Sequence, residues 1–168
     1  MIPLEDYIFE SSIKNMSADE YREALKENFP NEYSSVTGWL KKEDVYQNPP
    51  EDEHTSDRKA FGGIPWIEYW KRMTGFKGNH LKCPFCNRDI FIDETGPDAF
   101  LMRMEHPQPS LDYYKAVGGH YHKNKYDNED GYIIIPVCKG CNGKGEDEDF
   151  EVKDTIMFAK EIGAKTKE

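Results

Sequence analysis

The sequence predicts an α+β fold in which a small β-hairpin core is held together by a metal ion and surrounded by peripheral α-helices. Three observations lead to this prediction. Two Cys-x-x-Cys pairs, far apart in the chain, use all four cysteines. The stretch 131–137 is rich in β-branched residues and is bounded by Gly and Pro, which is typical of a strand. The segments 17–29 and 64–75 have apolar residues at helical spacing.

Charge divides the chain into an acidic first third and a more balanced remainder. We expect residues 1–56 to form an acidic N-terminal helical region and residues 57–168 to form the metal-binding domain. Residues 1–56 contain five basic and thirteen acidic residues, a net charge of −8. Residues 57–126 carry +3 and residues 127–168 carry −5, which completes the net charge of −10. An acidic balance of this size disfavours non-specific binding to nucleic acid.

The chain carries no sign of membrane insertion or export. No apolar run has the length needed to span a bilayer, and the N-terminus lacks the basic start and apolar stretch of a signal peptide. We therefore expect a cytoplasmic protein with no membrane partner. Thiols stay reduced in the cytoplasm, so paired cysteines there indicate metal binding rather than disulfides.

The first helix is predicted over residues 17–29. Ser17 followed three residues later by Glu20 is a capping-box pattern, which satisfies two backbone amides at a helix start. Leu25 continues the helical spacing, and Pro30 ends it.

The second helix is predicted over residues 64–75. Pro65 suits a first helical turn, and Gly75 suits a C-terminal cap. Trp66 and Trp70 would share one face of this helix. We expect that face to pack against the cysteine-containing core, since buried aromatic rings dominate small cores. Stacking on nucleic-acid bases is the alternative use of such a face.

Three short strands are predicted over residues 89–93, 119–123 and 131–137. Residues 94–118 are punctuated by proline and glycine, so we expect irregular structure there. The stretch 150–163 is ambiguous, because its apolar residues fit a helix in one part and a strand in another.

The cysteines form the strongest motif of the chain. Cys83 and Cys86 make one Cys-x-x-Cys pair, and Cys138 and Cys141 make the other. In each pair the spacing lets two sulfurs of a tight turn face one ion, and two such knuckles complete the tetrahedron that Zn²⁺ prefers. The alternative is a thioredoxin-like redox pair together with two idle cysteines. A closed four-cysteine site has no open position for substrate, so we predict a structural zinc ion.

The surroundings of the second pair resemble the HNH family. The resemblance rests on Gly118-Gly119-His120 and on the run from Tyr132 to Gly145, which reads YIIIPVCKGCNGKG. Members of that family with zinc knuckles have an upstream Cys-x-x-Cys, a histidine on the first strand of a hairpin, and a second Cys-x-x-Cys followed by Asn. The resemblance implies a ββα-metal unit within a treble-clef zinc site.

The resemblance also implies roles for individual residues. His120 would be the general base that activates water against a phosphodiester, and Asn142 would orient that base. A Mg²⁺ ion would stabilise the developing charge. The family has Asp or His as a metal ligand just before the base, and this chain has Gly119 there. His122, two residues on and on the same strand face, could supply a ligand instead. The other candidate ligands, all away from the family position, are Glu105, His106, Glu146, Asp147 and Asp149.

The histidines and Asn142 also have purely structural interpretations. His120 could pack beside the zinc knuckles, and His122 could be an exposed strand residue. His80 and His54 fit surface positions, His54 in a charged, proline-containing loop. Asn142 could terminate a zinc knuckle, because Asn tolerates left-handed backbone and hydrogen-bonds locally.

Two functions are consistent with these observations. The first is a non-catalytic zinc-binding module that binds another macromolecule, either a protein with a basic face or a nucleic acid. The second is a Mg²⁺-dependent HNH-type endonuclease with His120 as general base. The two differ in whether His120 faces a solvent-open cleft beside a carboxylate or a second histidine.

Overall fold

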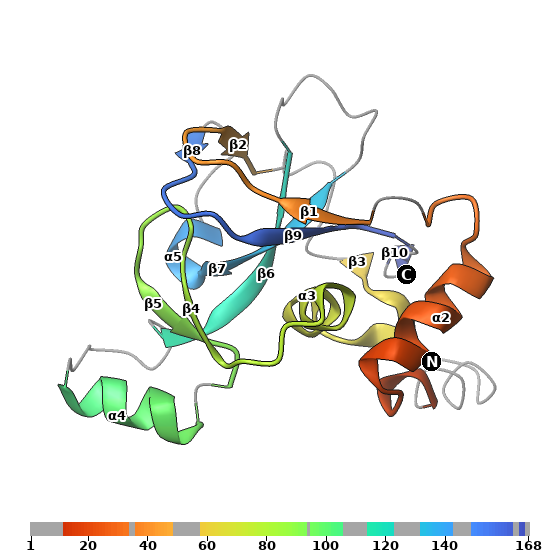
Figure 1. Cartoon of the computed structure of the whole chain (residues 1–168), viewed down its shortest axis with the longest axis horizontal. Coiled ribbons are helices and arrows are strands. Elements are labelled where there is room, and N and C mark those ends of the chain that lie inside the picture. Colours follow the sequence, from red (N-terminus) through yellow and green to blue (C-terminus); the bar gives the residue numbers. More distant parts are fainter. Residues whose placement is uncertain are drawn as a thin grey trace.

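The computed structural model describes residues 12–33, 36–48, 58–93, 95–105, 114–122, 132–142, 149–162 and 165–166. The charged loop expected around His54 lies outside these residues. Helices and short antiparallel sheets combine in an α+β fold, as the sequence predicted (Figure 1). No helix in the described ranges is both long and apolar enough to cross a bilayer.

A four-stranded antiparallel sheet with the order β1-β9-β7-β6 forms the centre. Its strands are β1 (Thr37–Trp39), β9 (Met157–Lys160), β7 (Ile133–Cys138) and β6 (Ala116–Tyr121). The predicted hairpin is the β6–β7 pair, in which His120 lies opposite Ile134. The ambiguous C-terminal stretch contains strand β9 rather than a helix, because it pairs with β7 on one side and β1 on the other.

Helix α3 (Trp66–Thr74) is the predicted second helix, and it lies against the sheet (Figure 1). Gly75 caps it in a left-handed conformation, as expected. The helix approaches β6 closely because Gly118 has no side chain. A Cβ at Gly118 would lie 2.5 Å from the backbone carbonyl carbon of Trp66. Trp70 Nε1 donates a 2.8 Å hydrogen bond to the carbonyl oxygen of Met157, which ties α3 to β9.

Helix α2 (Ala18–Asn28) begins with the predicted capping box at Ser17 and Glu20. Its buried residues Tyr21 and Leu25 belong to the same hydrophobic cluster as Trp70. The sequence left open whether residues 1–56 pack on the rest of the chain. In the structure, α2 packs on α3 and strand β1 pairs with β9. The described part of residues 1–56 therefore packs together with α3 and the central sheet.

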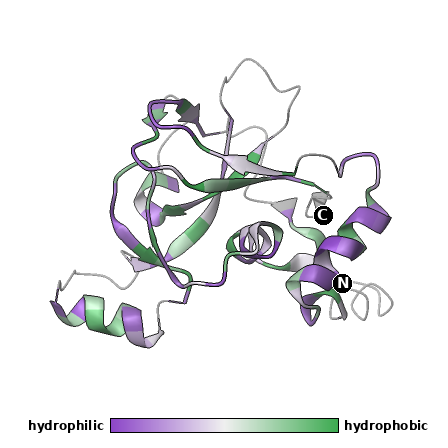
Figure 2. Ribbon diagram, viewed as in Figure 1, coloured by the Kyte–Doolittle hydropathy of each residue, from purple (hydrophilic) through white to green (hydrophobic). Residues whose placement is uncertain are grey.

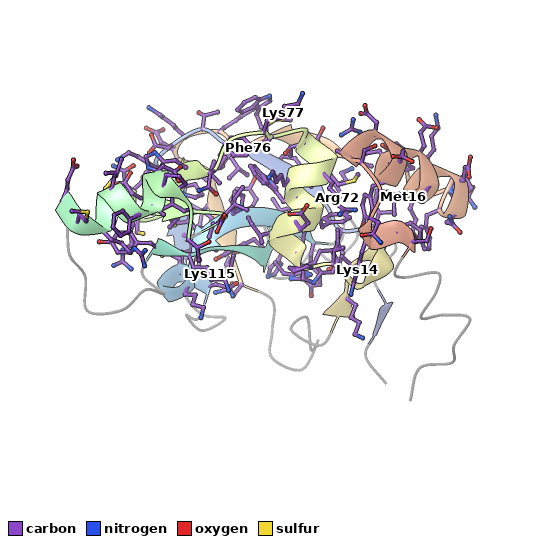
Figure 3. The ribbon with its side chains drawn as sticks, turned by 90° about the horizontal axis from the view of Figure 1, so that it is seen from below. Lys14, Met16, Arg72, Phe76, Lys77 and Lys115 are labelled. Carbon is purple, nitrogen blue, oxygen red and sulfur yellow. The ribbon has the colours of Figure 1, made fainter. Side chains whose placement is uncertain are left out.

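Arg72 connects the segment before α2 to helix α3. Its guanidinium donates hydrogen bonds to the carbonyl oxygens of Ile13, at 3.1 Å, and Lys14, at 2.7 Å. The same guanidinium lies 5.0 Å from the ring centroid of Tyr21. Figure 3 shows Arg72 on α3 beside Lys14 and Met16. One cation thus fixes the chain entering α2 against α3.

Three two-stranded sheets surround the central one. They pair β4 (His80–Lys82) with β5 (Asp89–Phe91), β2 (Val45–Gln47) with β8 (Asp149–Glu151), and β3 (Arg58–Lys59) with β10 (Lys165–Thr166). Strand β5 confirms the strand expected near 89–93, although it ends at Phe91. The first cysteine pair lies in the turn between β4 and β5.

Helix α4 (Pro97–Glu105) occupies a stretch for which irregular structure was expected, so that prediction was wrong. The helix lies at the edge of the molecule (Figure 1) and shows both apolar and polar residues in Figure 2. Ala99 is fully buried, while Phe100, Leu101 and Met104 are exposed. Helical periodicity is weak in this stretch because most of the apolar residues of α4 do not face the core.

Two large clusters of buried residues meet at the central sheet, and a third, smaller cluster contains Phe91, Ala99 and Tyr114. The first, here called the cysteine-side core, contains Cys83, Phe85, Ile90, Tyr121, Ile135, Val137, Cys138, Cys141, Phe150 and Val152, among others. The second, here called the helix-side core, contains Ile13, Tyr21, Leu25, Phe61, Tyr69, Trp70, Met73, Ile134 and Ala159, among others. Ile134 and Ile135 are neighbours on β7 but belong to different cores, as expected when alternate side chains point to opposite faces of a sheet.

Candidate metal centre

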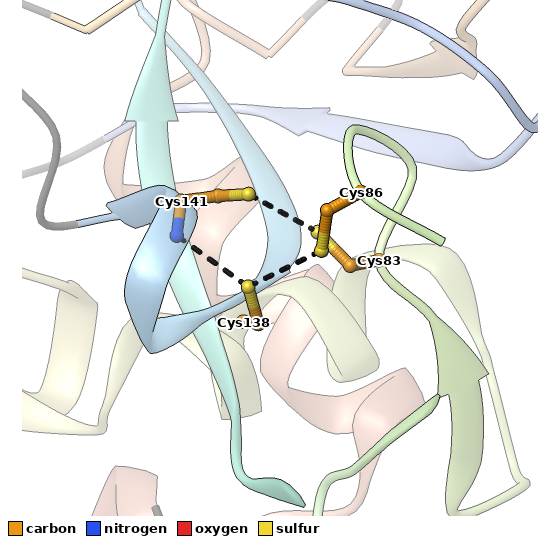
Figure 4. Close-up of side chains that lie close together, drawn as sticks. All are labelled: Cys83, Cys86, Cys138 and Cys141. Carbon is orange, nitrogen blue, oxygen red and sulfur yellow. Dashed lines mark hydrogen bonds between the residues drawn. The ribbon is translucent and has the colours of Figure 1, made fainter. Parts of the chain in front are cut away.

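The fold brings the four predicted cysteines together. Cys83 and Cys86 come from the β4–β5 turn, Cys138 ends β7, and Cys141 lies in the short helix α5 (Lys139–Asn142). Their four sulfurs all lie within 4.8 Å of one another (Figure 4). Residues from distant parts of the chain therefore converge on one point.

The spacing of the sulfurs fits a tetrahedral zinc ion. Cys83 Sγ lies 3.8 Å from Cys141 Sγ, and Cys86 Sγ lies 3.6 Å from Cys138 Sγ. A tetrahedron with Zn–S bonds of about 2.3 Å has sulfurs about 3.8 Å apart. The four residues present thus match the ligand type and the size that zinc requires.

Backbone hydrogen bonds shape both knuckles. In the first, Asn87 adopts a left-handed φ of 65°. Its N–H donates to the carbonyl oxygen of Cys83 at 2.8 Å, and the Cys83 N–H donates to that of Arg88 at 2.8 Å. Asn is one of the few side-chain-bearing residues that tolerates this conformation. In the second knuckle, the Cys141 N–H donates to Cys138 Sγ at 3.4 Å.

The thiols of the centre depend on one another for their protonation. Hydrogen bonds from the neighbouring thiols of Cys141 and Cys83 hold the pKa of Cys138 far below its usual range. Conversely, the hydrogen bond to Cys138 raises the pKa of Cys141 strongly, and it raises that of Cys83 to about 11. Without a cation, the cluster therefore favours one thiolate that accepts from its neighbours. A bound dication would deprotonate the remaining thiols, because metal coordination favours the thiolate.

His120 lies on the opposite side of the sheet from this centre, in a buried position. Its Nε2 is 2.5 Å from Oε2 of Glu161, and the two side chains are only 7% and 8% exposed. The Trp66 ring meets the imidazole edge-on, with 4.8 Å between ring centroids. Glu161 is held in place by its backbone, since its N–H donates to the carbonyl oxygen of Tyr132 at 3.0 Å.

Asn142 does not share a face of β6 with His120. A Cβ at Gly119 would lie 2.8 Å from Asn142 Oδ1, so the Asn142 amide lies on the side to which Gly119 would point. His120, the next residue, contacts Trp66 on the other side. The amide of Asn142 therefore lies beside Gly119, on the face of β6 opposite His120.

His122 is buried on the same strand face as His120. Both imidazoles meet the Tyr132 ring edge-on, at centroid distances of 6.2 Å for His120 and 5.8 Å for His122. His122 Nε2 lies 3.2 Å from the carbonyl oxygen of Asn48, and backbone hydrogen bonds join His122 to Gln47. The expectation of an exposed strand histidine is therefore wrong for His122.

The other candidate ligands are scattered. His80 is exposed and pairs with Asp89 at 2.7 Å, which agrees with a surface position. Asp149, in β8, accepts a 3.0 Å hydrogen bond from Gln47, in β2, and Glu105 ends α4. His54, His106, Glu146 and Asp147 lie outside the described residues. Across the described ranges, the four cysteines are the one group of three or more such ligands close enough to share an ion.

Glu161 is the residue of this region that sequence reasoning missed. It lies 41 positions after His120, and no motif connects the two. The signal that could have found it is the strand pattern of β9, which ends one residue before Glu161. Because that stretch was ambiguous between helix and strand, the direction of the Glu161 side chain could not be predicted.

Comparison with known proteins finds no matching family model, no matching curated protein and no matching solved structure. The function must therefore be argued from the residues themselves.

Proposed function

We propose that this chain is a zinc-stabilised module of the HNH-like, treble-clef type that binds another macromolecule without cutting it. The observation that carries the proposal is the cysteine cluster, whose sulfurs fit one tetrahedral zinc ion. The order of elements around it supports the treble-clef interpretation. The first cysteine knuckle is followed by β5 and α4, then by the β6–β7 hairpin, and then by α5, which contributes the last ligand.

The surroundings of His120 favour a non-catalytic role. A general base must reach the water or hydroxyl that it activates. His120 instead pairs with Glu161 under Trp66, at an exposure of 7%. At the neighbouring position, Gly119 provides no ligand for a catalytic ion, and the Asn142 amide lies next to it. Through these contacts, His120 joins β6 to the residue that follows β9.

The charge of the molecule favours a protein partner with a basic face. Helix α2 exposes Asp19, Glu20, Glu23 and Glu27 against the exposed Lys26 and the partly exposed Arg22, which forms an ion pair with Asp19. Such a surface steers cationic partners and repels phosphate backbones. Helix α2 is rigidly attached to α3 through Tyr21 and Leu25. The acidic face would therefore be presented on a fixed support.

An HNH-type endonuclease is the second candidate function. One observation favours it, namely the Glu161 carboxylate 2.5 Å from His120 Nε2. A carboxylate in this position holds an imidazole in a fixed orientation. Catalysis would require His120 to become accessible and a Mg²⁺ ion to be held by other residues.

One experiment separates the two candidates. The purified chain is tested for zinc content and for cleavage of supercoiled plasmid and single-stranded DNA with Mg²⁺ or Mn²⁺, beside a His120→Gln variant. We expect one zinc per chain and no cleavage by either protein. Cleavage by the unmodified chain that disappears in His120→Gln at equal zinc content would establish the nuclease. A chain without zinc would refute both candidates.

A further inference from the structure

The four sulfurs of the metal centre are not equally accessible. Cys86 is exposed, whereas Cys83, Cys138 and Cys141 are buried. Thiolates oxidise in proportion to their accessibility and their thiolate character. When zinc keeps all four cysteines as thiolates, their solvent accessibility determines which one is oxidised first. A soluble oxidant therefore reacts first with Cys86.

Two of the close sulfur contacts join one knuckle to the other. Cys86 lies 3.6 Å from Cys138, and Cys83 lies 3.8 Å from Cys141 (Figure 4). A disulfide requires sulfurs about 2.05 Å apart. Cys86 and Cys138 therefore need to approach by only about 1.5 Å, a movement that becomes available once the ion between them leaves.

We propose that this centre is a redox-sensitive switch, in which peroxide joins Cys86 to Cys138 in a disulfide and releases the zinc ion. The proposal rests on the proposed function, because the starting state is the zinc-bound chain. It goes beyond that function by assigning a regulator, a hydroperoxide, and by naming the pair of cysteines that responds.

The chemistry balances in two steps. The Cys86 thiolate attacks one peroxide oxygen, the O–O bond breaks, and hydroxide leaves, so Cys86 becomes a sulfenic acid. The Cys138 thiolate then attacks the sulfenic sulfur, the S–S bond forms, and a second hydroxide leaves. Two electrons pass from the two sulfurs to the peroxide. Zinc keeps its oxidation state and leaves because two of its four ligands are gone.

A disulfide between cysteines of different knuckles would keep the two knuckles connected after zinc leaves. Cys86 and Cys138 are 52 positions apart, so their disulfide keeps the β4–β5 turn attached to the end of β7 after zinc leaves. A disulfide between Cys138 and Cys141 would lie within one knuckle and would leave the two knuckles unconnected. The switch therefore exchanges a metal cross-link for a covalent one at the same place.

The first test uses the full zinc-loaded chain and limiting hydrogen peroxide. Released zinc is followed with a chromogenic chelator, and the first disulfide is identified by peptide mass spectrometry. We expect one zinc released per disulfide, Cys86–Cys138 as the first linkage, and recovery of zinc binding after reduction. A first linkage within either knuckle, or disulfides formed with zinc retained, would overturn the proposal. A purified chain without zinc would refute the proposed function instead. Identification of the first disulfide by mass spectrometry would still test the Cys86–Cys138 linkage.

The second test compares Cys86→Ser with Cys141→Ser at equal zinc loading. Each variant keeps three thiolate ligands, so each weakens zinc binding in a comparable way. Only Cys86→Ser removes the accessible thiolate, and we expect its peroxide-driven zinc release to be about tenfold slower than that of Cys141→Ser. Equal rates would overturn the assignment of Cys86. If neither variant retains zinc, the mapping on the unmodified chain decides.

Discussion

The two sides of the central sheet are stabilised in different ways. The helix-side core contains large side chains such as Tyr21, Tyr69 and Trp70, each at most 1% exposed. Their polar atoms also bond to backbone carbonyl oxygens, as Tyr21 does to Phe61 and Trp70 does to Met157. The cysteine-side core is enclosed by shorter elements, among them the three-residue strands β4 and β5 and the four-residue helix α5.

This difference fits the proposed metal ion on the cysteine side of the sheet. A two-stranded hairpin and a single helical turn are each marginal in water, because little apolar burial offsets the entropy of ordering them. Aromatic residues on the helix side bury enough area to order α2 and α3 without assistance. On the cysteine side, the proposed zinc ion would supply the cross-link, and its binding energy would become folding energy.

Removal of zinc should have the largest effect, and it should fall on the cysteine-side core. Structural zinc contributes roughly 10–16 kcal/mol in small zinc-binding peptides, more than any single side chain. We expect a strong chelator to expose the amides of Cys83 and Lys153, which bond to Arg88 and Pro84. Hydrogen exchange followed by mass spectrometry measures this, with the amides of α3 as the internal reference.

A Cys138→Ser variant provides the control for that measurement. This variant should already exchange rapidly around β4 and β5, and the chelator should change it little. Equal loss of protection in α3 and in the β4–β5 hairpin would contradict the separation into two differently stabilised cores.

Truncation of Trp70 should have the next largest effect, on the helix-side core. Trp70→Ala removes a side chain that is 1% exposed and leaves the Met157 carbonyl without its partner. The expected loss is about 3–5 kcal/mol in the free energy of unfolding, measured by urea denaturation. Trp39 is 61% exposed, so Trp39→Ala is a matched control that should change stability by less than about 0.5 kcal/mol. Zinc content should be the same in both variants, and loss of zinc from folded Trp70→Ala would contradict the comparison.

The features predicted correctly from the sequence are those set by neighbouring residues. The capping box of α2, the glycine cap of α3 and the β-branched strand β7 each depend on a few adjacent positions, and each is confirmed. The cysteine cluster was predictable for the same reason, because metal knuckles have a local spacing.

The features that were missed depend on contacts between distant residues. Strand β9 is defined by pairing with β7 and β1, and no local pattern separates it from a helix. The approach of Glu161 to His120 follows from that pairing, so it could not be predicted either. Helix α4 was missed for the opposite reason, since it buries little beyond Ala99 and lacks an apolar stripe.

Gly118 offers a smaller and more local test of the helix-side packing. Gly118→Ala would place a methyl group 2.5 Å from the Trp66 carbonyl carbon, and backbone cannot move aside as a flexible side chain can. We expect a loss of about 1–3 kcal/mol, typical of overpacking, measured as a shift in the urea midpoint. Gly140→Ala is the matched control on the cysteine side, because its Cβ would meet only Cys138 Sγ at 3.8 Å. Since Gly→Ala lowers the entropy of the unfolded chain and by itself stabilises the protein, a loss in Gly140→Ala as large as that in Gly118→Ala would contradict the attribution of the loss to α3 packing.

The capping box of α2 should give the smallest loss of stability among these tests. Ser17 Oγ accepts a 3.2 Å hydrogen bond from the Glu20 N–H, and the Glu20 carboxylate accepts one of 3.2 Å from the Ser17 N–H. Ser17→Ala removes the first and should cost about 1 kcal/mol, measured by thermal denaturation at constant zinc. Ser17→Asp keeps an oxygen acceptor at a helix N-terminus and should cost almost nothing. Because α2 packs on the helix-side core, both variants should leave zinc retention against a chelator unchanged. Faster loss of zinc from Ser17→Ala would mean that the two cores unfold together, and that zinc stabilises α2 as well as the knuckles.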